Sequence, residues 1–209
     1  MGFFNSNLNI EVKISDKNTK MGMVPSVSLP PVIFCHNCKE CVKKCYARRM
    51  YQRLSNVREQ YDFNWSLWNE NPDKYFEDIS QVMSCTDKFR FHVSGDIPNM
   101  DYLERLISVC RKNKKCQVLC FTKNYQDVNS WLTIHKRLPK NLHLIFSVWD
   151  NTPYENPFNL PTAHVLYRDG HTTAKNPTHL CDGNCFKCFI NDQGCIGLKK
   201  GESVVFKQH

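Results

Sequence analysis

Residues 89–123 read FRFHVSGDIPNMDYLERLISVCRKNKKCQVLCFTK, which is a strand, a helix and a second strand in succession. Residues 89–96 and 116–123 are short runs rich in apolar and aromatic side chains, typical of buried strands. Between them, apolar residues recur at helical spacing, at Leu103, Leu106, Ile107 and Cys110. This order favours two neighbouring parallel strands joined by a crossover helix.

The same alternation extends outward from this stretch. Further strands are predicted at residues 24–31, 143–149, 163–167 and 203–207. Further helices are predicted at residues 46–61, from residue 71 to 83, and at 128–138. About five strands are too few for a closed eight-stranded barrel, so we expect an α/β fold, a partial (open) β/α barrel with parallel strands. Polar residues at the carboxyl ends of those strands would gather at one edge of the sheet.

We divide the chain into two parts. Residues 1–178 are predicted to form the partial barrel, with a cysteine loop at residues 35–45. Residues 179–209 are predicted to form a small, cysteine-rich, metal-binding C-terminal appendage. The length of 209 residues suits one domain with such an addition.

The composition narrows the class of protein. With 41% hydrophobic residues the chain can bury a core, and no apolar run approaches the length of a membrane span. The N-terminus lacks the pattern of a secretion signal, so we expect a soluble cytoplasmic protein without a membrane partner. Twelve cysteines in a reducing compartment indicate metal or redox chemistry rather than disulfides.

Four of the cysteines form a compact first group with the spacing C-x2-C-x2-C-x3-C: Cys35, Cys38, Cys41 and Cys45. Such spacing lets one loop fold around an inorganic cluster, as in the cysteine runs of bacterial ferredoxins. A [4Fe-4S] cluster is the preferred interpretation, with a compact zinc loop and unliganded thiols as alternatives.

Another four form a second group with the spacing C-x3-C-x2-C-x6-C: Cys181, Cys185, Cys188 and Cys195. This group predicts a structural zinc site or a second iron–sulfur cluster that stabilises the tail. Uncoordinated thiols are the alternative. The remaining cysteines lie in apolar patterns; Cys85, Cys110 and Cys120 are predicted to be small core residues, and Cys116 either a core residue or a ligand.

The position of the first group resembles that in radical S-adenosylmethionine (SAM) enzymes, where a cluster loop follows the first strand and precedes repeated β/α units. The resemblance implies a [4Fe-4S] cluster with three cysteine ligands and a fourth iron that binds SAM. Those enzymes use the order C-x3-C-x2-C, whereas here Arg48 stands at the third position, so Cys35 or Cys38 would join Cys41 and Cys45. By spacing alone, the second group has that order, and the opposite assignment would place SAM there.

Polar residues at the predicted strand ends complete the candidate site. Ser94-Gly95-Asp96 looks like the motif that holds the SAM amino group in radical SAM enzymes. The predicted cofactor-binding residues are Ser94, Gly95, Asp96, Thr122, Ser147 and Trp149, and the predicted catalytic residues are Asp96 and Lys123. The plainer interpretation makes Ser-Gly-Asp a turn before a helix and Lys123 a solvated charge.

Nearly the whole chain also resembles the gene product 88 family of bacteriophages and some bacterial genomes. The residues that carry the resemblance are Gly22–Pro31, Cys41-x3-Cys45-Tyr-Ala, Phe91–Asp96, Phe121-Thr-Lys123, Asn156-Pro157, the cysteines of 181–188, Gly194-Cys195 and Leu198-Lys199-x-Gly201-Glu202. The resemblance implies a phage-encoded protein of the host cytoplasm and names no reaction.

The net charge of +8 comes with basic clusters at residues 43–49, 111–115 and 136–140. Two sites of four thiolates, each about −2 with its metal, would offset part of this excess. The two later clusters lie near predicted helix C-termini, which favours solvated surface charge, with nucleic acid as an alternative partner.

The preferred function is therefore an iron–sulfur enzyme of radical-SAM-like type, with SAM, an unknown substrate and a reductant protein as partners. The alternatives are a zinc- or iron–sulfur-stabilised module that binds nucleic acid or a host protein, and an electron-transfer protein.

Overall fold

The computed structural model describes residues 3–19, 21–33, 35–175 and 177–208. Its helices are α1 (Phe3–Asn7), the 3-10 helix η1 (Cys41–Lys44), α2 (Tyr46–Arg53), α3 (Ser55–Glu70), α4 (Pro72–Ser84), α5 (Met100–Lys112), α6 (Tyr125–His135), α7 (Cys185–Asn191) and α8 (Gly194–Gly197). Its strands are β1 (Ser26–Val27), β2 (Lys88–Phe91), β3 (Gln117–Thr122), β4 (Leu142–Ser147), β5 (Thr162–Leu166), β6 (Pro177–Leu180) and β7 (Ser203–Lys207). In this part of the chain, no helix is long and apolar enough to cross a membrane.

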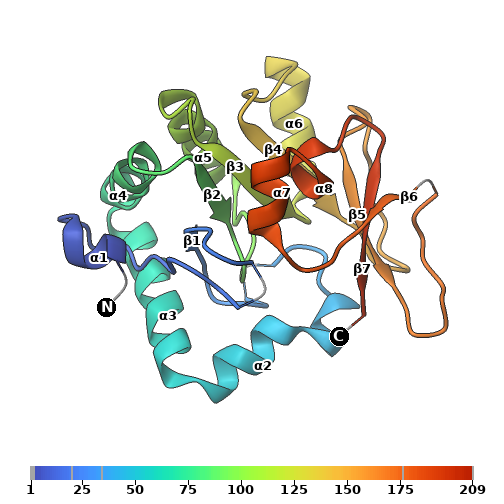
Figure 1. The fold of residues 1–209 in the computed structure, drawn as a ribbon, viewed down its shortest axis with the longest axis horizontal. Coiled ribbons are helices and arrows are strands. Elements are labelled where there is room, and N and C mark those ends of the chain that lie inside the picture. Colours follow the sequence, from blue (N-terminus) through green and yellow to red (C-terminus); the bar gives the residue numbers. More distant parts are fainter. Residues whose placement is uncertain (1–2, 20, 34, 176, 209) are drawn as a thin grey trace.

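The seven strands form one parallel sheet in the order β1-β2-β3-β4-β5-β7-β6. The edge strands β1 and β6 do not pair with each other, so the sheet does not close (Figure 1). The α/β class, the parallel strands and the open sheet are confirmed. Parallel strands place all their carboxyl ends at one edge, which is where the loops that follow β1, β2 and β3 lie.

The tail supplies two of these strands. The predicted strand at 203–207 is β7, and it lies between β5 and β6. The strand β6 was not predicted, because three of its four residues are exposed and no apolar pattern marks it. The cysteine-rich tail is therefore built onto the same sheet as the preceding residues.

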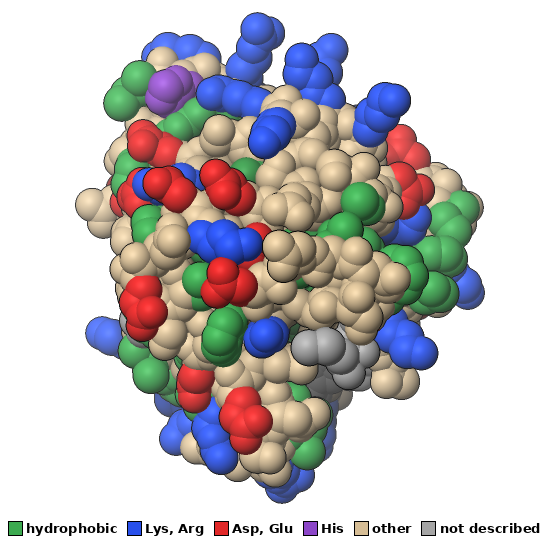
Figure 2. All heavy atoms as spheres, turned by 90° about the vertical axis from the view of Figure 1, so that its left-hand side faces the viewer, with side chains coloured by type: hydrophobic (Ala, Val, Ile, Leu, Met, Phe, Trp, Pro, Cys, Tyr) green, Lys and Arg blue, Asp and Glu red, His purple; other side chains and the backbone are tan. Residues whose placement is uncertain are grey.

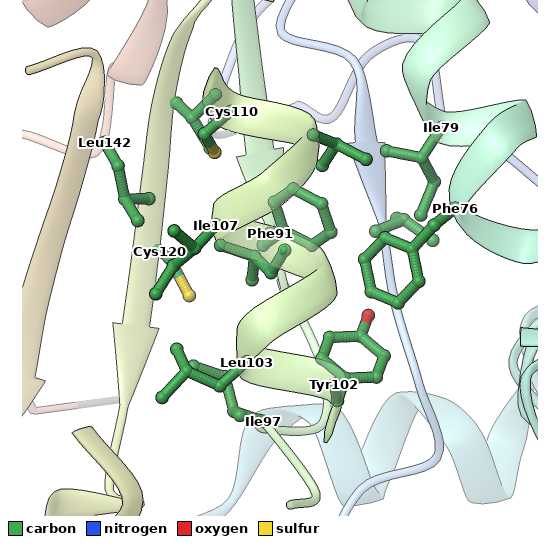
Figure 3. Close-up of a cluster of buried hydrophobic side chains, with 14 of the residues drawn as sticks. Phe76, Ile79, Phe91, Ile97, Tyr102, Leu103, Ile107, Cys110, Cys120 and Leu142 are labelled. Atoms are coloured by element: carbon green, nitrogen blue, oxygen red, sulfur yellow. The ribbon is translucent and has the colours of Figure 1, made fainter. Parts of the chain in front are cut away.

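Helices cover both faces of the sheet. In Figure 1, α4 and α5 lie at the upper left of the strands, α6 lies above them, and α7 and α8 lie in front. Figure 3 shows the larger core, where Phe76 and Ile79 of α4 and Tyr102 and Ile107 of α5 meet Phe91 of β2. Alternate strand residues face the two layers, since Val118 lies in this core while Leu119 packs with Ile145, Cys195 and Ile196 in a smaller one.

The single helix predicted at residues 46–61 is wrong. Leu54 has an extended backbone, with φ −113° and ψ 108°, and divides the segment into α2 and α3. The break lets the two helices contact each other: the Tyr51 hydroxyl donates to Asp62 at 2.5 Å, and the rings of Tyr51 and Tyr61 stack with centroids 6.4 Å apart. Helical periodicity continues through such a turn, so the pattern alone does not show it.

The prediction for one of the four cysteines outside the two groups is wrong. Cys110, Cys116 and Cys120 are buried, as expected of small core residues, but Cys85 is exposed. Cys85 is the C-cap of α4, one residue after the helix ends, and so it leaves the apolar stripe that the helix buries.

Candidate functional site

The first cysteine group lies at the carboxyl edge of the sheet. Its loop follows β1, and two side chains of the loop hold it against the loops after β2 and β3. Asn37 Nδ2 donates to the Lys123 carbonyl at 2.9 Å, and His36 Nε2 lies 3.0 Å from the Pro98 carbonyl. These contacts bring the cysteines beside two predicted site residues, Asp96 and Lys123.

Cys45 and Cys41 interact directly. The Cys45 sulfur accepts from the backbone N–H of Arg48 at 3.4 Å and thereby caps the N-terminus of α2. The hydrogen bond from Cys41, together with the helix amides, lowers the pKa of the Cys45 thiol to about 6, while the same hydrogen bond and burial raise the pKa of Cys41. The lowered pKa favours the thiolate of Cys45, and the thiolate is the form that binds metals.

Cys35 and Lys123 face the same space. Burial, followed by the negative charge of Asp96, raises the pKa of Cys35 to about 11. For the Lys123 ammonium, burial acts to lower the pKa, but negative charge on Cys41, Asp96 and Cys35 raises it overall. A cation therefore lies within electrostatic reach of three thiols of the loop, counting Cys45 with Cys35 and Cys41. The Cys38 thiol points toward the residues that precede the loop, and its sulfur lies 4.0 Å from the Val32 carbonyl oxygen.

Asp96 is buried and bound entirely by protein donors. Its carboxylate accepts from Thr122 Oγ1 at 2.6 Å, from the Lys123 backbone N–H at 2.9 Å and from the Ile97 backbone N–H at 2.8 Å. Burial raises the pKa of Asp96 overall, although these donors and the Lys123 ammonium oppose the rise. In this arrangement Asp96 positions Thr122 and Lys123 rather than presenting its carboxylate to the loop.

Ser94 and Gly95 differ in role. The Ser94 hydroxyl is buried and has no hydrogen-bond partner among the described residues, so it is free to bind a polar group. Gly95 has φ +84°, and a Cβ there would lie 2.7 Å from Leu29 Cβ and 3.0 Å from the Leu29 carbonyl oxygen. The glycine is needed because the loop after β2 crosses directly over the chain that follows β1.

The end of β4 is connected to this site through Tyr125. The Tyr125 hydroxyl donates to the Ser147 carbonyl at 2.5 Å, and negative charge on Asp96 and Cys41 adds to the burial that raises the pKa of Tyr125. Trp149 is half-buried in the turn after β4. Within the described ranges, no hydrogen bond or ring contact joins its side chain to the cysteine loop.

The second cysteine group lies on the opposite face of the sheet from the larger core. Cys181 follows β6, Cys185 and Cys188 lie in α7, and Cys195 lies in α8. Burial raises the pKa of Cys195, and negative charge on the other three thiols raises it further, so all four lie within electrostatic reach of one another. The spacing in the sequence has brought together four soft donors.

Arg90 of β2 projects into this group. Its Nη1 lies 3.4 Å from the Cys185 sulfur and 3.1 Å from the Met21 sulfur, and its guanidinium carbon lies 5.1 Å from the Phe121 ring centroid. Burial acts to lower the pKa of Arg90, whereas charge on Cys185, Tyr46 and Cys195 raises it. In the described part of the chain no Asp or Glu pairs with Arg90, so its nearest potential counterions are thiolates.

His179 supplies a nitrogen beside the second group. Its Nε2 is buried and has no hydrogen-bond partner among the described atoms. A Cβ added at Gly194, which has φ +53°, would lie 2.7 Å from the Cys188 sulfur and 2.9 Å from His179 Nε2. The glycine therefore lets the backbone pack closely against both the Cys188 sulfur and the unpartnered His179 nitrogen.

The donor atoms of these two groups are of the types that bind metals, but they do not lie close enough together to bind a single ion. Across residues 3–19, 21–33, 35–175 and 177–208, no three His, Cys, Asp or Glu side chains meet closely enough to bind one ion. A tetrahedral zinc site needs its sulfurs within about 4 Å of one another, given a Zn–S distance of about 2.3 Å. A cubane cluster spreads its cysteine ligands over a larger volume than a single ion does.

Three residues of this region were missed from the sequence: Asn37, Arg90 and His179. The position of His179 two residues before Cys181 is a His-x-Cys pattern that could have drawn attention to it. Arg90 had a weaker signal, a charged residue between two phenylalanines of a predicted strand. Nothing local marks Asn37, whose partner is distant in the chain.

Comparison with known proteins identifies a family. The sequence profile described as gene product 88 matches residues 4–203, nearly the whole chain. No curated protein and no solved structure matches it. The match includes both cysteine groups and the loops after β2 and β3. The chain therefore belongs to the gene product 88 family.

Proposed function

We propose that the chain is an iron–sulfur protein of radical-SAM-like type, in which the loop at residues 35–45 holds a [4Fe-4S] cluster at the carboxyl edge of a partial β/α barrel. Cys35, Cys41 and Cys45 would be the ligands that leave one iron open, and Cys38 the residue that could close it. SAM would bind at the open iron, and a reductant protein would supply the electron.

The observation that carries the proposal is the position of Lys123 among the thiols of the loop. Lys123 is half-buried, and the charges that raise its pKa belong to Cys41, Asp96 and Cys35. A partly buried cation needs anions close by. Asp96 supplies one such anion, and metal-bound thiolates of the loop would supply more than neutral thiols can.

The surrounding residues would bind and orient the cofactor. The unpartnered Ser94 hydroxyl can accept from an amino group or donate to a carboxylate, and Gly95 keeps the chain close to the loop. Asp96 would act by holding Thr122 and Lys123, and Lys123 would neutralise an anionic group. Ser147, at the end of β4, and Trp149, in the turn that follows, would line the side of the SAM-binding site opposite the cysteine loop. When bound, the cluster and SAM supply one-electron chemistry, and the protein supplies binding, orientation and exclusion of water.

The second cysteine group would hold zinc or a further cluster. Thiolates bound to a metal would compensate the charge of Arg90, which is otherwise surrounded by sulfur and aromatic groups. His179 would bind the metal or donate to the Cys188 sulfur. Such a site would stabilise α7 and α8, which are only seven and four residues long.

Metal analysis of the anaerobically purified protein tests this proposal. We expect iron and sulfide in about a four-to-four ratio per cluster, with loss of one cluster when Cys41 and Cys45 are both changed to Ala. Cys85→Ser is the matched control, because Cys85 is exposed and belongs to neither group. Zinc alone in the wild-type protein, or iron retained by the double variant, would contradict a cluster in this loop.

A further inference from the structure

The basic clusters that follow α5 and α6 form one surface. Seven cations lie within 30 residues, at the ends of two neighbouring helices and in the turns that lead into β3 and β4: Arg111, Lys112, Lys114, Lys115, Lys136, Arg137 and Lys140. All seven are exposed. Figure 2 shows lysine and arginine side chains gathered along the upper edge of the molecule, beside a histidine. We name these seven residues the basic edge.

The basic edge has no internal counterions. The single acidic residue between positions 111 and 140 is Asp127, which lies in the first turn of α6, at the other end of that helix. In the described ranges none of the seven cations forms an ion pair with a carboxylate. Clustered like charges repel one another, so an anionic partner would relieve a cost that the free protein carries.

The basic edge is also hollowed. A cavity of about 510 Å³ is lined by Arg111, His135, Arg137, Leu138, Pro139 and Lys140. A second cavity of about 450 Å³ shares Arg111, Pro139 and Lys140 with the first and adds Lys114. Because the two cavities share these residues, they adjoin each other, and we name the pair the groove; its lining includes Arg111, Lys114, Arg137 and Lys140.

The floor of the groove is rigid. Asn141 is buried, and its Nδ2 lies within hydrogen-bond distance of three carbonyl oxygens, those of Cys110, Asn113 and Cys116 at 3.0, 3.1 and 2.8 Å. These contacts fix the turn after α5 against the start of β4. Lys114 and Lys115 therefore extend from a turn whose backbone is held on both sides, at Asn113 and at Cys116.

We propose that the basic edge binds the phosphodiester backbone of nucleic acid without reading its sequence. A groove lined by four cations, with three more on the same edge, suits a chain of closely spaced phosphates. Trp131 is buried, and the exposed ring that lines the groove is that of His135, which already stacks on Trp131 with centroids 4.2 Å apart, so no Trp, Tyr or Phe ring is offered for base stacking in this part of the structure. Apart from the exposed Ile134, large apolar side chains that would form the centre of a protein interface are also lacking there.

This proposal does not depend on the proposed cluster. The basic edge lies at the amino ends of β3 and β4, whereas the cysteine loop lies at the carboxyl edge of the sheet. The sequence interpretation of solvated charge near helix C-termini explains Arg111 and Lys112, which lie in the last turn of α5. It does not explain Lys114, Lys115, Arg137 and Lys140, which lie in the turns.

Fluorescence anisotropy with a labelled DNA duplex of random sequence, over a series of salt concentrations, tests the proposal. The test variant is Lys114→Gln, Lys115→Gln, Arg137→Gln and Lys140→Gln together. The control variant is Lys175→Gln, Lys199→Gln, Lys200→Gln and Lys207→Gln, four exposed lysines elsewhere. Both variants remove four positive charges from the net +8, so they differ only in where the charges were.

We expect the wild-type protein and the control to bind alike. The test variant should bind about tenfold or more weakly at low salt, and the slope of log K against log salt should fall by about 3 to 4. Equal weakening by both variants would overturn the proposal, as would a wild-type protein that does not bind the duplex at low salt. Binding to anionic lipid vesicles that the duplex does not compete away would assign the surface to membranes instead. Circular dichroism of both variants checks that they are folded.

Discussion

Cys45 shows how a single residue connects local structure with reactivity. Its sulfur caps α2 and accepts from Cys41, and the folded protein therefore lowers its pKa from about 9 to about 6. Because the lowered pKa favours the thiolate, that form predominates above about pH 6. We predict that alkylation of Cys45 by iodoacetamide in the metal-free protein reaches half its maximal rate near pH 6, measured by mass spectrometry of digested samples.

The donor from Cys41 is the largest cause of this shift. In Cys41→Ala the pH midpoint for Cys45 should therefore move upward toward 9. Cys85, which is exposed, serves in the same sample as the control for reagent and exposure. An unchanged midpoint in Cys41→Ala would show that the two sulfurs do not interact.

Gly95 is a position where backbone conformation and close packing act together. We predict that Gly95→Ala lowers the free energy of unfolding by about 3 kcal/mol or more, since the new Cβ would meet Leu29 at 2.7 Å at a positive φ. Gly170 is the matched control, with φ +85° and no atom within 4 Å of its added Cβ. Gly170→Ala should lower the free energy of unfolding by only about 1–2 kcal/mol, the cost of placing a side chain at a positive φ. Equal costs in urea unfolding would show that contact with Leu29 is unimportant.

At the scale of elements, side chains hold the N-terminal segment in place where no strand does. Asp78 of α4 is fully buried, and its Oδ2 accepts from the backbone N–H groups of Glu11 and Val12 at 2.7 and 3.1 Å. Asn64 of α3 likewise accepts from the Lys13 N–H at 2.7 Å and donates to the Lys13 carbonyl at 3.0 Å. The chain before β1 is thereby fixed across α3 and α4.

Removing the Asp78 carboxylate should leave these amides buried without acceptors. We predict a loss of about 2–4 kcal/mol in the free energy of unfolding for Asp78→Ala. Asp73, on the same helix, pairs with Arg105 but is exposed, so Asp73→Ala should cost less than about 1 kcal/mol. Chemical unfolding of the two variants measures the difference, and equal losses would contradict this account of the segment.

The elements differ in how far the sequence could predict them. Strands β2 to β5 were predictable because each is a short run rich in apolar side chains, and both cysteine groups were predictable from spacing alone. The two-residue β1 lies within the strand predicted at residues 24–31 and is shorter than predicted, whereas the exposed β6 has no such pattern. Arg90 and Cys185 are 95 positions apart in the sequence. Their contact could not be predicted, because only the order of the strands in the sheet brings them together.

For the molecule as a whole, His92 makes stability depend on pH. His92 is buried at the end of β2, with Nε2 2.9 Å from the Tyr102 hydroxyl, and burial, with the charge of Arg90, lowers its pKa to about 3. In the unfolded chain His92 is protonated below about pH 6.5, whereas in the folded chain it stays neutral down to about pH 3. The free energy of unfolding therefore falls as the pH drops from about 6.5 toward 3. At pH 5 this loss is about 2 kcal/mol.

His92→Asn isolates this contribution, because asparagine accepts the positive φ of 47° and can still bond Tyr102. Between pH 7.5 and 5, the metal-free variant should lose about 2 kcal/mol less stability than the wild-type protein. Urea unfolding at both pH values measures the difference. Equal losses would show that His92 does not titrate in this way.

The central claim is that the loop at residues 35–45 holds an iron–sulfur cluster with an open iron beside Lys123. The most direct test is electron paramagnetic resonance of the anaerobic, dithionite-reduced protein, recorded with and without SAM. The account predicts a reduced-cluster signal that changes when SAM is added and disappears in the Cys41→Ala, Cys45→Ala variant. A signal that SAM leaves unchanged would indicate electron transfer or a structural cluster, and no signal from a zinc-containing protein would contradict the claim.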